Sequence, residues 1–183
     1  MAYLITKIFY YSIIGFFMKG IKGLENIPKD KNFIIVANHD HLIDPVIMQY
    51  PFLKKDKKVH FLATPTWWFV GDTIARKWAA CIPLFNPKQA FEESKDLIRQ
   101  GEIVGIFPEG HLDAKVRDIK SGAVRLALAT KASILPIGVK SNYLPFSCSI
   151  KIGRPIYPNK NKKAKNHVVE IMDYVYRLKG ELK

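Results

Sequence analysis

Two titratable residues, His39 and Asp44, follow shortly after an apolar, β-branched run from Phe33 to Ala37. A neutral imidazole can take a proton near pH 7, and a carboxylate can fix its tautomer and stabilise the imidazolium. On one regular helix, residues five apart diverge by about 140°, so this pair can meet only where the chain turns sharply. Two interpretations follow. The pair is a general base and its partner, or Asp44 caps a helix whose first residue is Pro45.

Asp40 and His41 lie between these two residues. For both we expect hydrogen bonds to solvent or within the turn. A rival interpretation is a metal hydrolase, because His39, His41 and Asp44 are ligand types that could hold a divalent ion. No further ligand-rich motif supports it, and the cysteine spacing fits no metal site.

The segments around this pair alternate between apolar strand-like runs and helix-length segments. Strands are expected at residues 33–37, 59–63, 81–85, 102–107, 132–140 and 146–152, and helices at 45–50, 66–80, 87–100, 120–131 and within 160–183. This alternation predicts a single α/β domain in which helices flank a mixed sheet. Pro51 is expected to limit the helix after Asp44. Pro136 falls inside an expected strand, so an edge or an irregularity is expected there.

Residues 1–20 are apolar and aromatic, interrupted by Lys7 and closed by Lys19. The run between these lysines is shorter than the roughly 20 residues that a membrane span needs. We predict a membrane-associating helix over 1–20 that lies in the membrane interface or dips into one leaflet. The alternative is a helix packed on the core of the domain, with Phe9, Ile13 and Phe16 facing inwards. Residues 21–183 form the remaining domain, which ends in a basic helix.

The composition gives the chain a net charge of +13 and a pI of about 9.7 over 183 residues, with 48% apolar residues. Such a charge favours anionic partners, which include nucleic acids, acidic membrane surfaces and anionic substrates. A basic nucleic-acid-binding module is a distant alternative, because no helix-turn-helix, RNA-binding or zinc pattern appears. The two cysteines, Cys81 and Cys148, lie in apolar surroundings and suit a reducing compartment.

Four sequence blocks stand in order along the chain. They are Asn38-His39-x4-Asp44, Cys81-Ile82-Pro83, Phe107-Pro108-Glu109-Gly110, and Ile134 to Val139. Over roughly residues 20 to 155, the chain resembles the glycerolipid acyltransferase family, whose best-known members are 1-acyl-sn-glycerol-3-phosphate acyltransferases. The resemblance implies a glycerol-phosphate-acyltransferase-like fold.

The resemblance also implies roles for individual residues. His39 would be the catalytic base and Asp44 its partner, while Glu109 and Gly110 would help to bind the acyl acceptor and its phosphate. Lys120 would be a phosphate ligand. The implied reaction joins an acyl chain from acyl-CoA or acyl carrier protein to a lysophospholipid hydroxyl, giving phosphatidic acid when the acceptor is 1-acyl-sn-glycerol-3-phosphate. Apart from this co-substrate, no cofactor is implied.

The chain departs from the family pattern at two places. Relatives that use glycerol phosphate continue the third block with Thr-Arg, where this chain has His111-Leu112, and they have an Arg shortly after the Pro of the second block. The usual arginine clamp for phosphate is therefore missing. Lys120, Arg117, Lys88 or Arg125 could compensate as cations. Alternatively, the acceptor is a lipid or polyol without a phosphate monoester.

No Ser or Cys stands in a nucleophile-elbow pattern, which favours direct transfer over an acyl-enzyme. Backbone N–H groups near Gly110 or His111 are the candidates for stabilising the oxyanion. The substrates implied by the resemblance are lipids, so we expect a monotopic or peripheral protein on the cytoplasmic face of a membrane. Its expected partners are membrane lipids and the acyl carrier.

Overall fold

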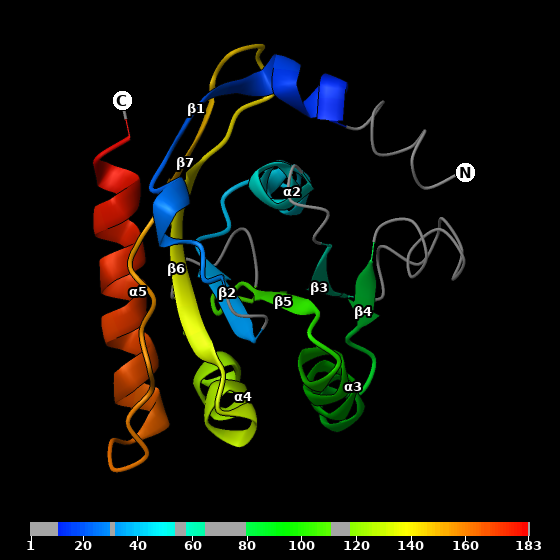
Figure 1. Ribbon diagram of the computed structural model, residues 1–183, viewed down its shortest axis with the longest axis vertical. Helices are drawn as coiled ribbons and strands as arrows, with labels where there is room; N and C mark the ends of the chain where they lie inside the picture. The colour runs from blue at the N-terminus through cyan, green and yellow to red at the C-terminus, as the bar shows by residue number, and fades with distance from the viewer. Residues whose placement is uncertain (1–10, 30–31, 54–57, 65–79, 111–117, 183) are drawn as a thin grey trace.

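A mixed β-sheet forms the centre of the protein (Figure 1). The structure is a computed structural model that describes residues 11–29, 32–53, 58–64, 80–110 and 118–182. Within these ranges the strands are β1 (Met18–Lys22), β2 (Phe33–Ala37), β3 (Val59–Ala63), β4 (Cys81–Pro83), β5 (Ile103–Ile106), β6 (Ser133–Lys140) and β7 (Cys148–Ile152). Their order is β1-β7-β6-β2-β5-β3-β4, and all neighbours run parallel except β6 and β7. The α/β class and the mixed sheet are thus confirmed.

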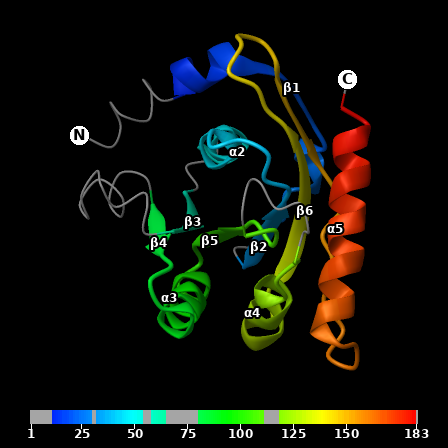
Figure 2. The same cartoon turned by 180° about the vertical axis from the view of Figure 1, so that it is seen from behind.

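Helices cover both faces of the sheet (Figure 2). They are the short 3-10 helix η1 (Leu24–Asn26) and the α-helices α2 (Asp44–Leu53), α3 (Pro87–Arg99), α4 (Gly122–Thr130) and α5 (Ala164–Gly180). Residues 11–17 are also helical. The helix α2 and residues 11–17 pack on one face, and α3, α4 and α5 pack on the other. The expected helix at 66–80 lies outside the described residues except for Ala80.

The strand β2 lies in the middle of the sheet and all five of its residues are buried. Side chains alternate along a strand. Phe33 and Ile35 therefore join the core under α2, whereas Ile34 and Val36 join the core under α3, α4 and α5. Burial on both faces explains why this strand reads as an unbroken apolar run. It also fixes the position of the polar residues that follow Ala37.

Two expected helix boundaries were wrong. Helix α2 does not stop before Pro51 but continues to Leu53. Proline removes one backbone hydrogen bond in a helix interior, and burial of Phe52 and Leu53 in the core offsets this cost. Residues 18–20 were expected in the first helix but belong to β1, because Met18 and its successors pair with β7. The expected boundary between residues 20 and 21 therefore falls inside a strand of the main sheet.

Pro136 lies in β6 between β2 and β7, where its missing N–H has to be accommodated. The antiparallel ladder between β6 and β7 ends at the pair Ile137 and Ile152. Beyond it, Gly153 donates its N–H to the Pro136 carbonyl at 2.8 Å, and a single bridge joins Ile134 to Ile156. The proline therefore occupies an irregularity, as its presence in the strand predicted.

Candidate active site

Three of the parallel strands, β2, β5 and β6, end on the same side of the sheet, which we call its carboxyl edge. The polar residues of the sequence blocks follow these strand ends. Residues 38–44 follow β2, residues 107–110 follow β5, and Ser141 follows β6. Since β2 pairs in parallel with both β5 and β6, the three strand ends are neighbours in space. Crevices outside the carboxyl ends of parallel strands are the usual place for sites in α/β sheets.

The carboxylate of Asp44 is fully buried and accepts four hydrogen bonds. Its Oδ2 atom lies 3.0 Å from Nδ1 of His39 and accepts the backbone N–H groups of Asp40 at 2.7 Å and His41 at 2.9 Å. Its Oδ1 atom accepts the hydroxyl of Ser141. The chain thus turns sharply between residues 39 and 44, as the pairing requires. Asp44 binds the turn before the helix and is the first helical residue, so the interpretation as an N-cap is wrong.

These contacts determine the charge of Asp44 and the tautomer of His39. Burial by itself raises the pKa of Asp44, but the hydrogen bonds from His39, His41, Ser141 and Asp40 lower this pKa below its ordinary value of 3.8. The carboxylate is therefore ionised at neutral pH, and an ionised carboxylate can only accept hydrogen bonds. The Nδ1 atom of neutral His39 then carries the proton. Its Nε2 atom is left with a lone pair that can take a proton from a substrate.

The His39 ring is also held by an aromatic stack. The imidazole stacks on the ring of Phe107, with the two ring centroids 4.2 Å apart. The ring of Phe107 stacks in turn on that of Phe61, with a centroid distance of 5.3 Å. The ring of Phe61, which is on the neighbouring strand β3, lies over Gly105 of β5. A Cβ atom at this position would come within 2.3 Å of the ring. The side chain of His39 is 17% exposed, so the ring is fixed on one face yet still reaches solvent.

The turn itself is tied to the sheet by side chains. The amide of buried Asn38 donates to the Val139 carbonyl at 2.9 Å and accepts the Val139 N–H at 2.8 Å, so it extends the pairing of β2 with β6. The Nδ1 atom of His41 lies 3.1 Å from the hydroxyl oxygen of Ser141. In the described part of the chain, no group of three His, Cys, Asp or Glu side chains is arranged to hold a metal ion.

Glu109 is 3% exposed, and the two oxygens of its carboxylate bind protein groups. Oε2 accepts the backbone N–H of His39 at 2.9 Å, and Oε1 accepts the hydroxyl of Tyr176. Glu109 therefore holds the segment that bears His39, and its expected contact with an acceptor stays a prediction.

Gly110 adopts a left-handed φ of 76°, and its N–H binds the Phe107 carbonyl at 3.2 Å. Because this N–H already binds within the turn, Gly110 does not present it to an oxyanion, contrary to the expectation. His111, the other expected donor, lies outside the described residues.

Among the expected cations, Lys120 is connected to this edge of the sheet. Its backbone N–H binds the Pro108 carbonyl at 2.8 Å, while its ammonium group pairs with Asp118. Lys165 also pairs with Asp118 at 2.7 Å, and the two ammonium groups lower the pKa of Asp118 to about 2. Lys88 is an exposed residue of the first turn of α3. Arg117 lies outside the described residues, and Arg125 is exposed on α4.

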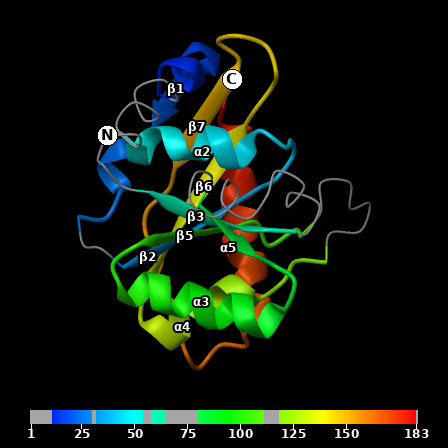
Figure 3. The same ribbon diagram turned by 90° about the vertical axis from the view of Figure 1, so that its right-hand side faces the viewer.

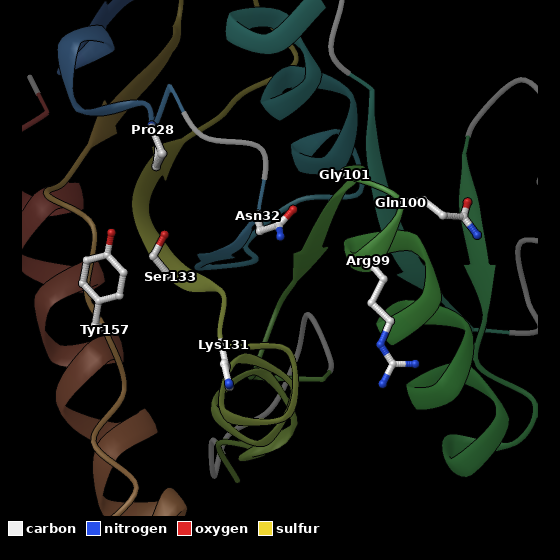
Figure 4. A pocket seen from close by; sticks show the side chains of 8 residues that line it. All are labelled: Pro28, Asn32, Arg99, Gln100, Gly101, Lys131, Ser133 and Tyr157. Carbon is white, nitrogen blue, oxygen red and sulfur yellow. The ribbon is translucent and has the colours of Figure 1, made fainter.

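A pocket of about 480 Å³ lies at the opposite edge of the sheet, the side on which β2, β5 and β6 begin (Figure 4). It is lined by residues at the beginnings of β2, β5 and β6 and at the ends of α3 and α4, among them Asn32, Arg99, Lys131, Ser133 and Tyr157. The sequence blocks contribute none of these five residues. The pocket is therefore separate from the cluster around His39.

Comparison with known proteins matches a family model to residues 20–140, which is more than half of the chain, and that family is described as acyltransferase. The match includes both strand ends with His39 and Glu109. The chain belongs to the acyltransferase family. The expected family is thereby confirmed, and the acyltransferase match stops before α5.

Relatives of this chain are named 1-acyl-sn-glycerol-3-phosphate acyltransferase. One from Borreliella burgdorferi is 33% identical over 137 residues, which cover 68% of this chain and 53% of the relative. Another from Bacillus subtilis is 28% identical over 116 residues, which cover 61% of this chain and 57% of the relative. The chain thus spans about half the length of the curated relatives it matches.

The fold is similar to the crystal structure of the 1-acyl-sn-glycerophosphate (LPA) acyltransferase PlsC from Thermotoga maritima. The TM-score is 0.72 at 24% sequence identity, and the match covers 97% of this chain and 78% of that chain. The similarity therefore extends over the mixed sheet and also over α5, which follows the part matched by the family model.

Sequence reasoning missed several members of the candidate site around His39. Ser141 comes directly after the expected strand 132–140, and Phe107 is the last residue of the expected strand 102–107, so their positions at strand ends were a usable signal. Asp40 and His41 were expected to bind solvent or the turn, yet their side chains have partners on other segments, Lys179 and Ser141. Tyr176 and Lys179 on α5 had no sequence signal, because a helical surface pattern does not say which residue reaches a distant turn.

Proposed function

We propose that the chain transfers an acyl group from a thioester, acyl-CoA or acyl-acyl carrier protein, to the hydroxyl of a lysophospholipid. The first candidate acceptor is 1-acyl-sn-glycerol-3-phosphate, with phosphatidic acid as the product. The single observation that supports this most is the His39–Asp44 pair in a member of the acyltransferase family. The names of the relatives support the choice of acceptor.

The proposed reaction is a direct transfer. The Nε2 atom of His39 takes the proton of the acceptor hydroxyl while the oxygen attacks the thioester carbon. Asp44 stabilises the imidazolium through Nδ1, and its buried position keeps the ring oriented. As the tetrahedral intermediate collapses, the C–S bond breaks and the imidazolium returns the proton to the thiolate. Ser141 donates to Asp44 and lies against His41, which supports a positioning role for it in place of a nucleophilic one.

The alternative acceptor, a lipid or polyol without a phosphate monoester, is favoured by a specific feature. Asp118 pairs with both Lys120 and Lys165, so its carboxylate competes with an incoming phosphate for these two cations. A phosphate would have to displace Asp118 or bind a different cation. The acceptor is therefore a question for assay.

The deciding assay measures thioester consumption by the full chain across matched acceptors. The panel contains 1-acyl-sn-glycerol-3-phosphate, a lysophospholipid with a phosphodiester headgroup, a monoacylglycerol and glycerol 3-phosphate, each with acyl-CoA and acyl-acyl carrier protein. His39→Ala is expected to lower turnover by about 10²–10⁴-fold with every active acceptor. Near-normal transfer in a folded His39→Ala protein would refute the mechanism, and preference for the monoacylglycerol would select the alternative acceptor.

The second part of the proposal is that the protein binds to a membrane surface. Among the described residues, no helix is long and apolar enough to cross a membrane. Within the helical residues 11–17, Ile14 is buried in the core, while Ile13 and Phe16 are 46% and 50% exposed. The helix thus packs on the core, as the alternative expected, but it does so through Ile14, with Tyr11 and Phe17 beside it, and not through Ile13 and Phe16. Phe9 lies outside the described residues.

The exposed side chains join a second apolar segment. Phe146 donates its N–H to the Phe16 carbonyl at 3.0 Å, and the two rings lie 5.1 Å apart. Together with Ile13, Tyr143 and Leu144 they form what we call the Phe16–Phe146 patch, whose loop residues are 58–62% exposed. Figure 3 shows residues 11–17 and the connection between β6 and β7 at the same end of the molecule. Tyr143 also contacts the His41 ring, so the patch begins beside the proposed site.

Exposed apolar side chains beside a proposed site for lipid substrates support monotopic or peripheral binding to a membrane surface. The cytoplasmic face, expected from the sequence, is part of the proposal. Because Ile14 and Met18 belong to the core, deleting the first 20 residues would also damage the fold, so point variants are the better test. We expect Phe16→Ser with Phe146→Ser to weaken sedimentation with anionic vesicles by about tenfold. The control is Tyr157→Ser at the opposite edge of the sheet. Equal sedimentation of the double variant and the wild type would refute the patch.

A further inference from the structure

We propose that helix α5 is the positioning element of the catalytic turn, acting through Tyr176 and Lys179. This inference rests on the proposed function, since it assigns a role in the step that His39 performs. The family model ends at residue 140 and the helix begins at Ala164. The two residues therefore lie beyond the sequence blocks that identify the family.

The first tether runs from Tyr176 to the backbone of His39. The Tyr176 hydroxyl donates to Oε1 of Glu109, and Oε2 of the same carboxylate accepts the His39 N–H at 2.9 Å. Glu109 is 3% exposed. A buried carboxylate is costly unless its oxygens receive hydrogen bonds, so the Tyr176 hydroxyl stabilises the orientation in which Glu109 holds His39.

The second tether runs from Lys179 to the residue after His39. Its ammonium group pairs with Oδ2 of Asp40, to which the Asn38 amide also donates at 3.1 Å. The two side chains of this pair are 31% and 20% exposed, so water screens the pair only in part. Residues 38, 39 and 40 are thus each joined, directly or through one side chain, to a group on α5.

The close approach of α5 to the sheet is what brings these two residues within reach. Figure 1 shows α5 alongside β6, with which it makes extensive contacts. At Gly138, a Cβ atom would lie 2.4 Å from the backbone N of Lys179 and 2.7 Å from the carbonyl carbon of Leu178. Only glycine leaves room for this helix turn at that position. Leu178 in this turn and Leu182 after it are both buried, which fixes the end of α5.

The physical consequence concerns the orientation of the imidazole. Asp44 and Phe107 hold the ring, but both contacts depend on where the His39 backbone stands. A displacement of about 1 Å in a catalytic group can lower the rate by about 10²-fold. Loss of one α5 tether should therefore lower kcat, with little effect on KM, because Tyr176 and Lys179 bind Glu109 and Asp40 and act through the position of His39.

The experiment compares Tyr176→Phe with Tyr174→Phe, which removes the same atom two residues earlier on the same helix. Within the described residues, the Tyr174 hydroxyl accepts a long 3.5 Å contact from the backbone N–H of Arg154, away from the catalytic turn. Acyl transfer is measured with acyl-CoA and 1-acyl-sn-glycerol-3-phosphate. The low-field proton NMR signal of the His39 Nδ1–H, assigned by its loss in His39→Ala, is measured without substrate. We expect Tyr176→Phe to lower kcat about tenfold with KM within about twofold, and to shift or broaden the ring signal.

Lys179 supplies an independent arm if Tyr176→Phe does not fold. Lys179→Met should lower kcat about fivefold, and Lys179→Arg should restore most of it because the cation still reaches Asp40. An unchanged kcat and ring signal in Tyr176→Phe and Lys179→Met would overturn the inference, as would equal effects of Tyr174→Phe. Full activity of His39→Ala would refute the proposed function instead, and the NMR signal would still decide whether α5 positions His39.

Discussion

The two edges of the sheet differ in how they use polar residues. At the edge with the carboxyl ends of β2, β5 and β6, Asn38 and Asp44 are fully buried, and partners from distant segments satisfy their hydrogen bonds. At the opposite edge, the pocket is lined by Arg99, whose side chain is 60% exposed, and by Tyr157, which is 76% exposed. The polar groups that line this pocket are thus less organised than those around His39.

The difference shows that a site is better recognised by buried polar groups with partners than by an open volume. Burying a carboxylate costs free energy unless hydrogen bonds compensate it. Asp44 is compensated by four groups, which leaves a fixed geometry around His39. An exposed cation such as Arg99 is solvated and can adopt many rotamers. The following predictions test this contrast, beginning with the largest expected effect.

Removing the charge of Asp44 should affect the catalytic edge most strongly. Asp44→Asn keeps the size of the side chain but no longer fixes the His39 tautomer, so we expect kcat to fall by about 10³–10⁴-fold. Steady-state thioester assays check this, with circular dichroism as the test of folding. A folded Asp44→Asn protein that keeps more than about a tenth of wild-type kcat would show that this edge is structural.

The same carboxylate should make stability depend on pH. The folded-state pKa of Asp44 lies below its ordinary value of 3.8, as described above. Its stabilisation is therefore complete above about pH 4 and is lost as the pH falls through the lower, folded-state pKa. Urea unfolding should give Asp44→Asn a deficit of about 2–3 kcal/mol at neutral pH. That deficit should shrink as the pH falls below the ordinary value of 3.8. A deficit that stays constant in acid would contradict an ionised Asp44.

The sequence predicted the sheet well because apolar runs report burial directly. Residues 33–37 lie between two cores and form β2 as expected. It could not predict helix ends that depend on packing, such as the continuation of α2 past Pro51. It also could not reveal that Glu109 holds the segment that bears His39, because a motif does not specify which way a carboxylate faces. The contacts of Glu109 with His39 and Tyr176 join segments 70 and 67 residues apart, which no local pattern encodes.

Lys120 should have a moderate effect that is confined to acceptor binding. Its side chain is 66% exposed and its backbone is held by Pro108, so truncation should not disturb the fold. If Lys120 leaves Asp118 to bind phosphate, Lys120→Ala should raise the KM of a phosphate-bearing acceptor by about three- to tenfold at constant kcat. Lys165→Ala is the matched control, because it removes the other partner of Asp118. An equal change in KM for a neutral acceptor would contradict phosphate binding by Lys120.

The smallest effect is expected at the pocket of the opposite edge. Arg99 pairs with Asp96 one helical turn away at 3.3 Å, and the two side chains are 60% and 62% exposed. An exposed pair of this kind contributes about 0–1 kcal/mol. Arg99→Ala combined with Lys131→Ala should therefore change kcat and KM by less than about twofold. Lys131 has a left-handed φ of 57°, so Lys131→Gly is a control that removes the side chain without adding strain. If both changes at this edge lower transfer by tenfold or more while the protein stays folded, the pocket takes part in the reaction, and buried polar order would no longer distinguish the two edges.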